Sequence, residues 1–189
     1  MKSSGMQVGR LRLLIIFENR GKKGRCEAKA IKEELKSVIA SINDVRVDTN
    51  HIEVDLFSDD AGYADKIKAE IKERILETVS VNEGVNPDYR SYLAQRRFWE
   101  AHESLEERWK REKDQKVKDS IRVSIQFCAA MVHYQRCNGE TAKEILKRAM
   151  AINSDIQLVQ GIIGVDMGGM NRVDPDLEQV MDQMVKAGH

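Results

Sequence analysis

The order of apolar and polar positions in the first half of the chain predicts a small sheet with helices packed on it. Residues 10–17 begin with polar and apolar positions in alternation and end in a continuous apolar run, which is typical of a strand buried on both faces. Residues 26–42 place apolar side chains three and four positions apart, as one face of an amphipathic helix does. Two short alternating segments, 45–47 and 52–56, flank a polar turn and therefore predict a hairpin.

A second helix and a last strand complete this part of the chain. Residues 58–60 supply a helix N-cap, and isoleucines follow it at four-residue steps. Residues 76–81 can form a strand, although they could instead continue the helix. We therefore predict the order βαββαβ over residues 1–83, which is the split βαβ pattern of ferredoxin-like domains.

The second half of the chain, residues 84–189, is predicted to be all helical. Asn86 caps a helix and Pro87 suits its first position, because the missing N–H of proline costs nothing there. This helix should run to about Lys113. Another should cover roughly residues 118–137, where an Asn-Gly pair ends it.

Two further helices follow in the pattern. Thr141 and Glu144 form a capping box that opens one of them, and Asp174 with Pro175 caps a short terminal helix. The glycine-rich stretch between them is a connector in this interpretation. We therefore expect an α+β chain of two domains, a ferredoxin-like unit followed by an all-α helical bundle.

The composition excludes several classes of protein. The chain has 189 residues, 41% of them hydrophobic and 33% charged, which fits one ordinary domain or two small ones. Basic and acidic residues both number 31, whereas nucleic-acid binding normally requires a basic excess. The sequence has no apolar stretch of membrane-spanning length and no apparent secretory signal. We expect a cytoplasmic protein without nucleic-acid or membrane partners.

One local cluster of basic residues, 20–25, follows the first predicted strand. Such a loop could hold a phosphate through backbone N–H groups at the start of the next helix. It lacks the Gly-Lys-Ser/Thr spacing of a P-loop, however, and the pattern favours a solvated loop.

Candidate chemistry gathers in the helix that begins at Pro87. A seam of residues at four- and three-residue steps has His102 among apolar members: Phe98, Leu105 and Trp109. Glu106 lies one turn after His102 on the same side, and Glu103 lies at the edge of the seam.

The following helix presents a matching face. Gln126 and His133 are seven residues apart and share a side of that helix, with two alanines between them. Small residues there would let two helices approach closely. If the helices pack antiparallel, we expect His102, Glu106, Gln126 and His133 to converge in their interface.

Three interpretations of this cluster are open. Buried carboxylates need partners, and histidine is a natural one, so the residues could form a hydrogen-bonded network that fixes helix register. They could instead line a ligand pocket. They could also hold a divalent transition metal, with His102, Glu106 and His133 as ligands and an open position that activates water.

The run from Phe98 to Trp109 resembles the signature of the domain of unknown function 309 family. That signature is an aromatic residue, Glu-Ala-His-Glu, a Leu-Glu pair and a Trp, followed by a Gln within an apolar helix, a later His and a Gly-Asn pair. The matching residues are Glu100, His102, Glu103, Glu106, Trp109, Gln126, His133 and Asn138. Cys137 stands where the family has Gly, and Val123-Ser124 where it has Gly-Leu. The likeness covers about residues 90–152 and implies a compact helical bundle with no agreed reaction.

We therefore expect a non-catalytic module that binds a small ligand or a protein partner beside this cluster. The expected binding residues are His102, Glu103, Glu106, Trp109, Gln126, His133 and Asn138. The alternative is a metal-dependent hydrolase that uses Glu103 or Glu106 as general base. An edge strand of the N-terminal sheet could also make the protein a homodimer.

Overall fold

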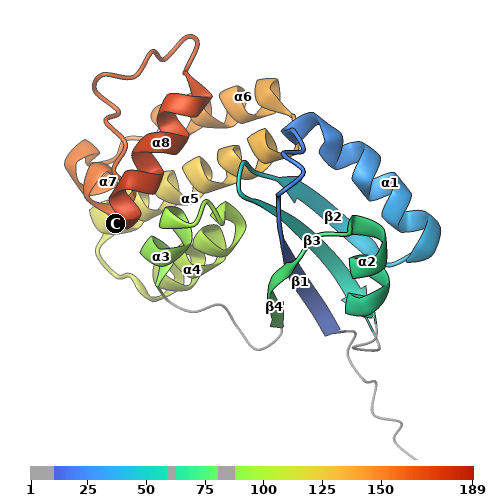
Figure 1. Cartoon of the computed structure of the whole chain (residues 1–189). Helices are drawn as coiled ribbons and strands as arrows, with labels where there is room; N and C mark the ends of the chain where they lie inside the picture. The colour runs from blue at the N-terminus through green and yellow to red at the C-terminus, as the bar shows by residue number, and fades with distance from the viewer. Residues whose placement is uncertain (1–10, 59–62, 81–87) are drawn as a thin grey trace, which may run out of the picture. The chain divides into compact units, whose positions relative to one another are not determined.

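The structure, a computed structural model, describes residues 11–58, 63–80 and 88–189. The chain divides into two compact units, Met1–Gly84 and Val85–His189. The first is a mixed α/β unit with a four-stranded antiparallel sheet, and the second consists of helices (Figure 1). The expected helix caps at residues 59–60 and 86–87 lie outside the described residues.

The N-terminal unit contains four strands and two α-helices. In chain order they are β1 (Leu11–Glu18), α1 (Ala28–Val38), β2 (Ile42–Val47), β3 (His51–Ser58), α2 (Tyr63–Ile71) and β4 (Ile75–Ser80). A short 3-10 turn, Arg25–Glu27, leads into α1. The strand order is β2-β3-β1-β4, and every neighbouring pair is antiparallel. The segment after α2 is therefore a strand and does not continue the helix.

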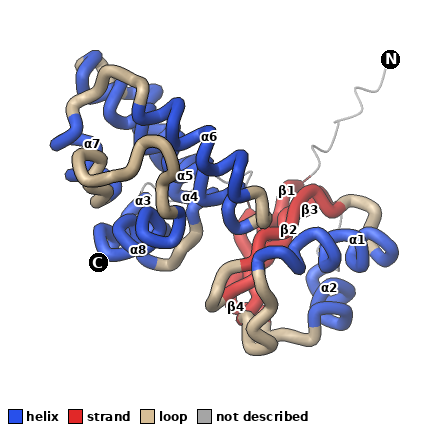
Figure 2. The backbone as a smooth tube through the Cα atoms, turned by 90° about the horizontal axis from the view of Figure 1, so that it is seen from above, coloured by secondary structure: helices blue, strands red, loops and turns tan. Residues whose placement is uncertain are grey.

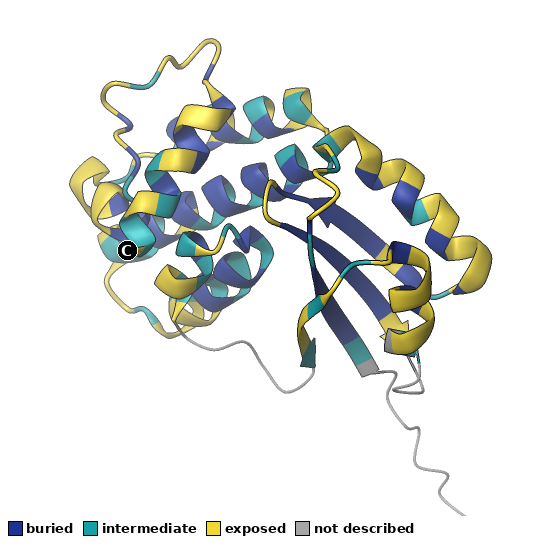
Figure 3. Cartoon of the chain, in the orientation of Figure 1, coloured by how far each residue is buried: buried dark blue, intermediate teal, exposed yellow. Residues whose placement is uncertain are grey.

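One face of this sheet forms the core of the N-terminal unit. Alternate residues of β1, namely Leu13, Ile15 and Phe17, pack with buried residues of both α1 and α2. Both helices lie on that same side of the sheet (Figure 2). The intervening residues Leu14 and Ile16 are also buried, as the continuous apolar run in β1 predicts. In Figure 3, β2, β3 and most of β1 are accordingly dark blue, whereas β4 is teal and yellow and the outer side of α1 is yellow.

The other face of the sheet carries buried charges. Arg46 of β2 lies directly across from Glu53 of β3, and its Nε donates to Glu53 Oε2. The second carboxylate oxygen of Glu53 lies 3.1 Å from His51 Nε2, and Arg46 also reaches Asp44 at 3.3 Å. Burial by itself raises the pKa of the Glu53 carboxyl. The Arg46 charge and the His51 contact outweigh that effect and lower the pKa to about 2.

The C-terminal unit contains six helices among its described residues. They are α3 (Tyr89–Ala94), α4 (Phe98–Arg111), α5 (Gln115–Gln135), α6 (Gly139–Met150), α7 (Ile156–Ile163) and α8 (Leu177–Gly188). Each contributes to one apolar core. No helix in the described part of the chain is both long and apolar enough to cross a membrane.

The prediction of a single helix from Pro87 to Lys113 is wrong, because residues 95–97 are not helical and separate α3 from α4. Arg96 adopts a left-handed backbone conformation, with φ 60°. Its N–H donates to the Leu93 carbonyl, and the next N–H, of Arg97, donates to the Tyr92 carbonyl. This pair of bonds is the Schellman ending of a helix, made here without the usual glycine.

Other helix boundaries also differ from the prediction. Helix α6 begins at Gly139, two residues before the expected capping box, and α8 is capped by Asp176, which accepts from Gln179 N. Helix α7, which Asp155 caps and Gly164 ends with φ 73°, was not predicted, and its last turn includes the first residues of the glycine-rich stretch 161–169. Asp155 accepts two backbone N–H groups and so fixes the start of α7, whereas no side chain caps the start of α6.

We predict that Glu53→Gln destabilises the N-terminal unit by about 3 kcal/mol at neutral pH, because Arg46 loses the carboxylate directly opposite it and keeps only Asp44 at 3.3 Å. The pKa of Glu53 in the folded chain lies below its ordinary value of 4.5, so its contribution is complete above pH 4.5 and is lost as the pH falls towards 2. Hydrogen–deuterium exchange of peptides from β1 and β3 measures both effects. The exposed Glu33→Gln control should not change exchange, and equal protection in native and Glu53→Gln chains would contradict the prediction.

Candidate functional site

A groove of about 440 Å³ lies among helices α4, α5 and α6 of the C-terminal unit. One of its lining residues, His102, belongs to α4, and four belong to α5. Two more belong to α6, and the last, Ile152, follows the end of α6. The lining residues are His102, Arg122, Ile125, Gln126, Ala129, Ile145, Arg148 and Ile152. The α5 members follow three- and four-residue steps, so they form one face of that helix.

His102 and Gln126, two residues of the predicted cluster, therefore line the same groove. Only three residues separate α4 from α5, so these two packed helices run antiparallel, as expected. Buried small side chains in both helices, Ala101 and Ser104 in α4 and Ser124 in α5, allow their close approach. The hydroxyl of Ser124 donates back to the Ser120 carbonyl at 2.9 Å and so needs no partner across the interface.

The cluster around His102 is half-exposed, whereas the sequence predicts a buried one. The side chains of His102, Glu103 and Glu106 are 24%, 35% and 40% exposed. The ring nitrogen Nδ1 of His102 lies 3.5 Å from Glu103 Oε1, and Nε2 lies 3.8 Å from Glu106 Oε1. At these distances the carboxylates are not hydrogen-bond partners of the imidazole. These residues lie at the edge of the helix contact, where water reaches them.

The remaining predicted residues lie elsewhere in the C-terminal unit. His133 is seven residues beyond Gln126, which is about 10 Å along α5, and it is not one of the groove's lining residues. Trp109 stacks under the ammonium group of Lys118, 4.6 Å from the ring centre. Asn138 is the N-cap residue of α6. Sharing a helix face does not bring these side chains to one place.

The predicted metal ligands do not form a group. Within residues 11–58, 63–80 and 88–189, no three His, Cys, Asp or Glu side chains are placed to hold a metal ion. His102, Glu106 and His133 are thus not such a group, because His133 lies two turns of α5 away from the groove. Cys128 is not an available nucleophile either, since burial raises the pKa of its thiol well above the usual range.

Two arginines of the groove were missed by sequence reasoning. Arg122 lies one turn before Gln126, and Arg148 lies three residues after Ile145. Neither has a carboxylate within ion-pair distance among the described residues. Arg148 Nε donates only to the Glu144 carbonyl, at 3.3 Å. The groove therefore combines an apolar floor with two guanidinium groups and an imidazole.

The buried polar pair of this unit was also missed. Nε of Arg97 donates to Glu100 Oε1 at 2.6 Å, and both side chains are buried. The guanidinium lies 5.0 Å from the centre of the Tyr92 ring, and Gln135 Nε2 donates to the Arg96 carbonyl at 2.9 Å. The sequence signal that could have predicted this pair is the spacing of Arg97 and Glu100, which are opposite charges three residues apart at the start of a helix.

Comparison with protein families matches residues 87–145 to the family described as Domain of unknown function (DUF309). This match confirms the resemblance carried by the α4 and α5 motifs. It contains every predicted binding residue, and it ends within α6 before Arg148. Comparisons with curated proteins and with solved structures gave no match.

We predict that Glu100→Gln lowers the unfolding free energy of the helical unit by about 3–5 kcal/mol, because Arg97 stays buried without its counter-charge. The double variant Arg97→Met with Glu100→Met should recover at least half of the loss, since it buries no charge. Tryptophan fluorescence during urea unfolding reports this unit, which holds both tryptophans. The exposed Glu107→Gln is the control and should leave the midpoint unchanged; a double variant as unstable as Glu100→Gln would refute the pairing argument.

Proposed function

We propose that the helical unit is a non-catalytic binding module that takes a small organic anion into the groove among α4, α5 and α6. The observation that supports this most is that His102, Arg122 and Arg148 line the same groove as four apolar side chains. Each of these three side chains comes from a different helix, so the cationic rim exists only in the folded unit.

The two arginines supply the affinity for an anion. A guanidinium presents paired N–H donors that match a carboxylate or phosphate edge. Because neither Arg122 nor Arg148 is paired with a carboxylate in the described part of the chain, binding an anion breaks no existing ion pair. A ligand charge would therefore be compensated there at small cost.

The floor of the groove supplies a place for an apolar body. Ile125, Ile145 and Ile152 line it, together with the small side chain of Ala129. A volume of about 440 Å³ is within the range of known small-molecule pockets, which run from about 300 to 1,000 Å³. An aromatic or branched aliphatic acid fits this combination of floor and rim.

His102 and Gln126 supply orientation. The imidazole can donate from one ring nitrogen and accept at the other, and the amide of Gln126 offers both functions as well. Glu103 and Glu106 lie beside His102 at the edge of the groove, with Oε1 atoms 3.5 Å and 3.8 Å from its ring nitrogens. His102 and Gln126 would select among anions that the arginines hold.

We also propose that the N-terminal unit is a ferredoxin-like domain. Its element order βαββαβ, its antiparallel neighbours in the order β2-β3-β1-β4 and the placement of both helices on one sheet face support this. A cytoplasmic location, the absence of a nucleic-acid partner and a homodimer through an edge strand stay predictions.

Phenyl phosphate is the probe for the groove, because it joins an aromatic body to an anionic group. Isothermal titration of the full chain should show binding, and Arg122→Gln with Arg148→Gln should weaken it about ten-fold or more, which is about 1.4 kcal/mol. The double variant Arg111→Gln with Arg172→Gln removes the same charge from exposed positions and should leave the affinity unchanged.

Phenol, which lacks the anionic group, should bind much more weakly than phenyl phosphate. If the groove variant and the exposed-arginine control lost binding equally, the groove would not be the binding site. Zinc and manganese are tested in the same series. A rise in melting temperature on adding either metal that His102→Ala abolishes would favour the metal-dependent hydrolase instead.

A further inference from the structure

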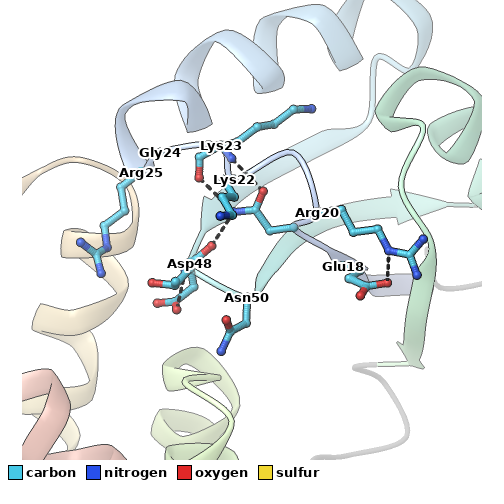
Figure 4. Close-up of a pocket in the computed structure, with 10 residues that line it drawn as sticks. Glu18, Arg20, Lys22, Lys23, Gly24, Arg25, Asp48 and Asn50 are labelled. Carbon is cyan, nitrogen blue, oxygen red and sulfur yellow. Dashed lines mark hydrogen bonds and ion pairs between the residues drawn. The ribbon is translucent and has the colours of Figure 1, made fainter.

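A second cavity, of about 750 Å³, lies in the N-terminal unit at one end of the sheet (Figure 4). The segment 18–25, which follows β1, forms one side of it, and the turn 48–50 between β2 and β3 forms the other. This is the basic cluster of the sequence, for which a phosphate site and a solvated loop were both open. All its lining residues belong to the N-terminal unit, so it is separate from the groove of the helical unit.

The cavity has an excess of positive charge. Four of its lining side chains are basic, namely Arg20, Lys22, Lys23 and Arg25, and two are acidic, Glu18 and Asp48. An excess of two charges on ten residues stands out in a chain whose formal net charge is zero. Such a concentration of one sign raises the local population of anions.

The two acidic groups are already engaged. Glu18 Oε2 accepts from Arg20 Nε at 2.9 Å and from Arg74 Nε at 3.2 Å. Asp48 Oδ1 accepts from the backbone N–H of Thr49 at 2.7 Å. By contrast, the ammonium groups of Lys22 and Lys23 form no ion pair or hydrogen bond with any residue in the described ranges. These two lysines are the cations left for a ligand.

Asn19 holds the two sides of the cavity together. Its side chain is buried, with the residue only 5% exposed. Its Nδ2 donates to the Lys23 carbonyl at 2.9 Å and to the Asp48 carbonyl at 2.8 Å, and its Oδ1 accepts from Lys23 N at 2.9 Å. The basic loop is therefore fixed against the β2–β3 turn, and little ordering is left for a ligand to impose.

Several backbone N–H groups of the basic loop are already used within the protein. The N–H of Gly21 donates to Glu73 Oε1 at 3.1 Å, that of Lys22 to the Asn19 carbonyl at 3.3 Å, and that of Gly24 to Glu27. These three donors are used within the protein, so the lysine and arginine side chains supply most of the donors that the loop offers to an anion. An anion in this cavity would be recognised by side chains.

We propose that this cavity binds a small-molecule polyphosphate, a chain of two or more phosphoryl groups. Lysine ammonium groups act as flexible point charges that can follow successive phosphoryl oxygens, and Arg20 has donors beyond the one used by Glu18. The cavity has the volume of roughly 25 water molecules, which is far more than one phosphate occupies. Its size and its spread of cations thus favour a polyphosphate over a single phosphate.

The test is isothermal titration of the full chain with sodium tripolyphosphate. The double variant Lys22→Gln with Lys23→Gln should bind about ten-fold or more weakly, and raising the salt from about 50 to 200 mM should weaken native binding steeply. Orthophosphate should bind less tightly than tripolyphosphate. The matched control, Lys29→Gln with Lys68→Gln, removes the same charge from exposed helix positions and should bind as the native chain does.

The groove variant Arg122→Gln with Arg148→Gln should also keep tripolyphosphate binding, so this inference and the proposed function can fail separately. Absence of native binding would overturn the inference, as would equal weakening in the control variant. Weakening by the groove variant in place of the lysine variant would assign the polyphosphate to the other unit and would equally overturn it.

Discussion

A charged side chain that leaves water needs an opposite charge beside it, and this constraint determines how both units of the chain are built. In the N-terminal unit, Arg46 and Glu53 meet across two strands on the second face of the sheet. In the helical unit, Arg97 and Glu100 meet at the start of α4. Removing one partner of either pair is costly, because the remaining charge stays buried without its direct partner.

The same constraint explains where the binding chemistry lies. Cations that are paired inside the protein are not available to a ligand, whereas Arg122 and Arg148 line a cavity and have no carboxylate partner in the described chain. Lys22 and Lys23 line the N-terminal cavity and likewise have no carboxylate partner in the described chain. The net charge of the chain is zero, but basic residues outnumber acidic ones around both cavities.

Hydrophobic periodicity predicted the features that depend on local sequence. The continuous apolar run predicted that β1 is buried on both faces, as it is. The residue spacing in α4 and α5 predicted that His102 and Gln126 lie together, and both line one groove. His133 is not among the residues that line the groove, because a spacing of seven preserves a helix face but moves a residue two turns along the axis.

Other features could not be predicted because they depend on the tertiary structure. The break at Arg96 places a non-glycine residue in a left-handed conformation, for which the sequence has no signal. Arg148 reaches the groove from a third helix, so no spacing within one helix connects it with His102. The polar face of the sheet is buried, although alternation along β2 and β3 is equally typical of a face exposed to water.

The central claim is that an organic anion binds in the groove among α4, α5 and α6. The most direct measurement is a nitrogen–proton NMR titration of the full chain with phenyl phosphate. The account predicts saturable shifts at the amides of Ile125, Gln126, Ala129 and Ile145, with the amides of α7 and α8 unmoved. Shifts confined to α7 and α8, or no shifts at all, would contradict it.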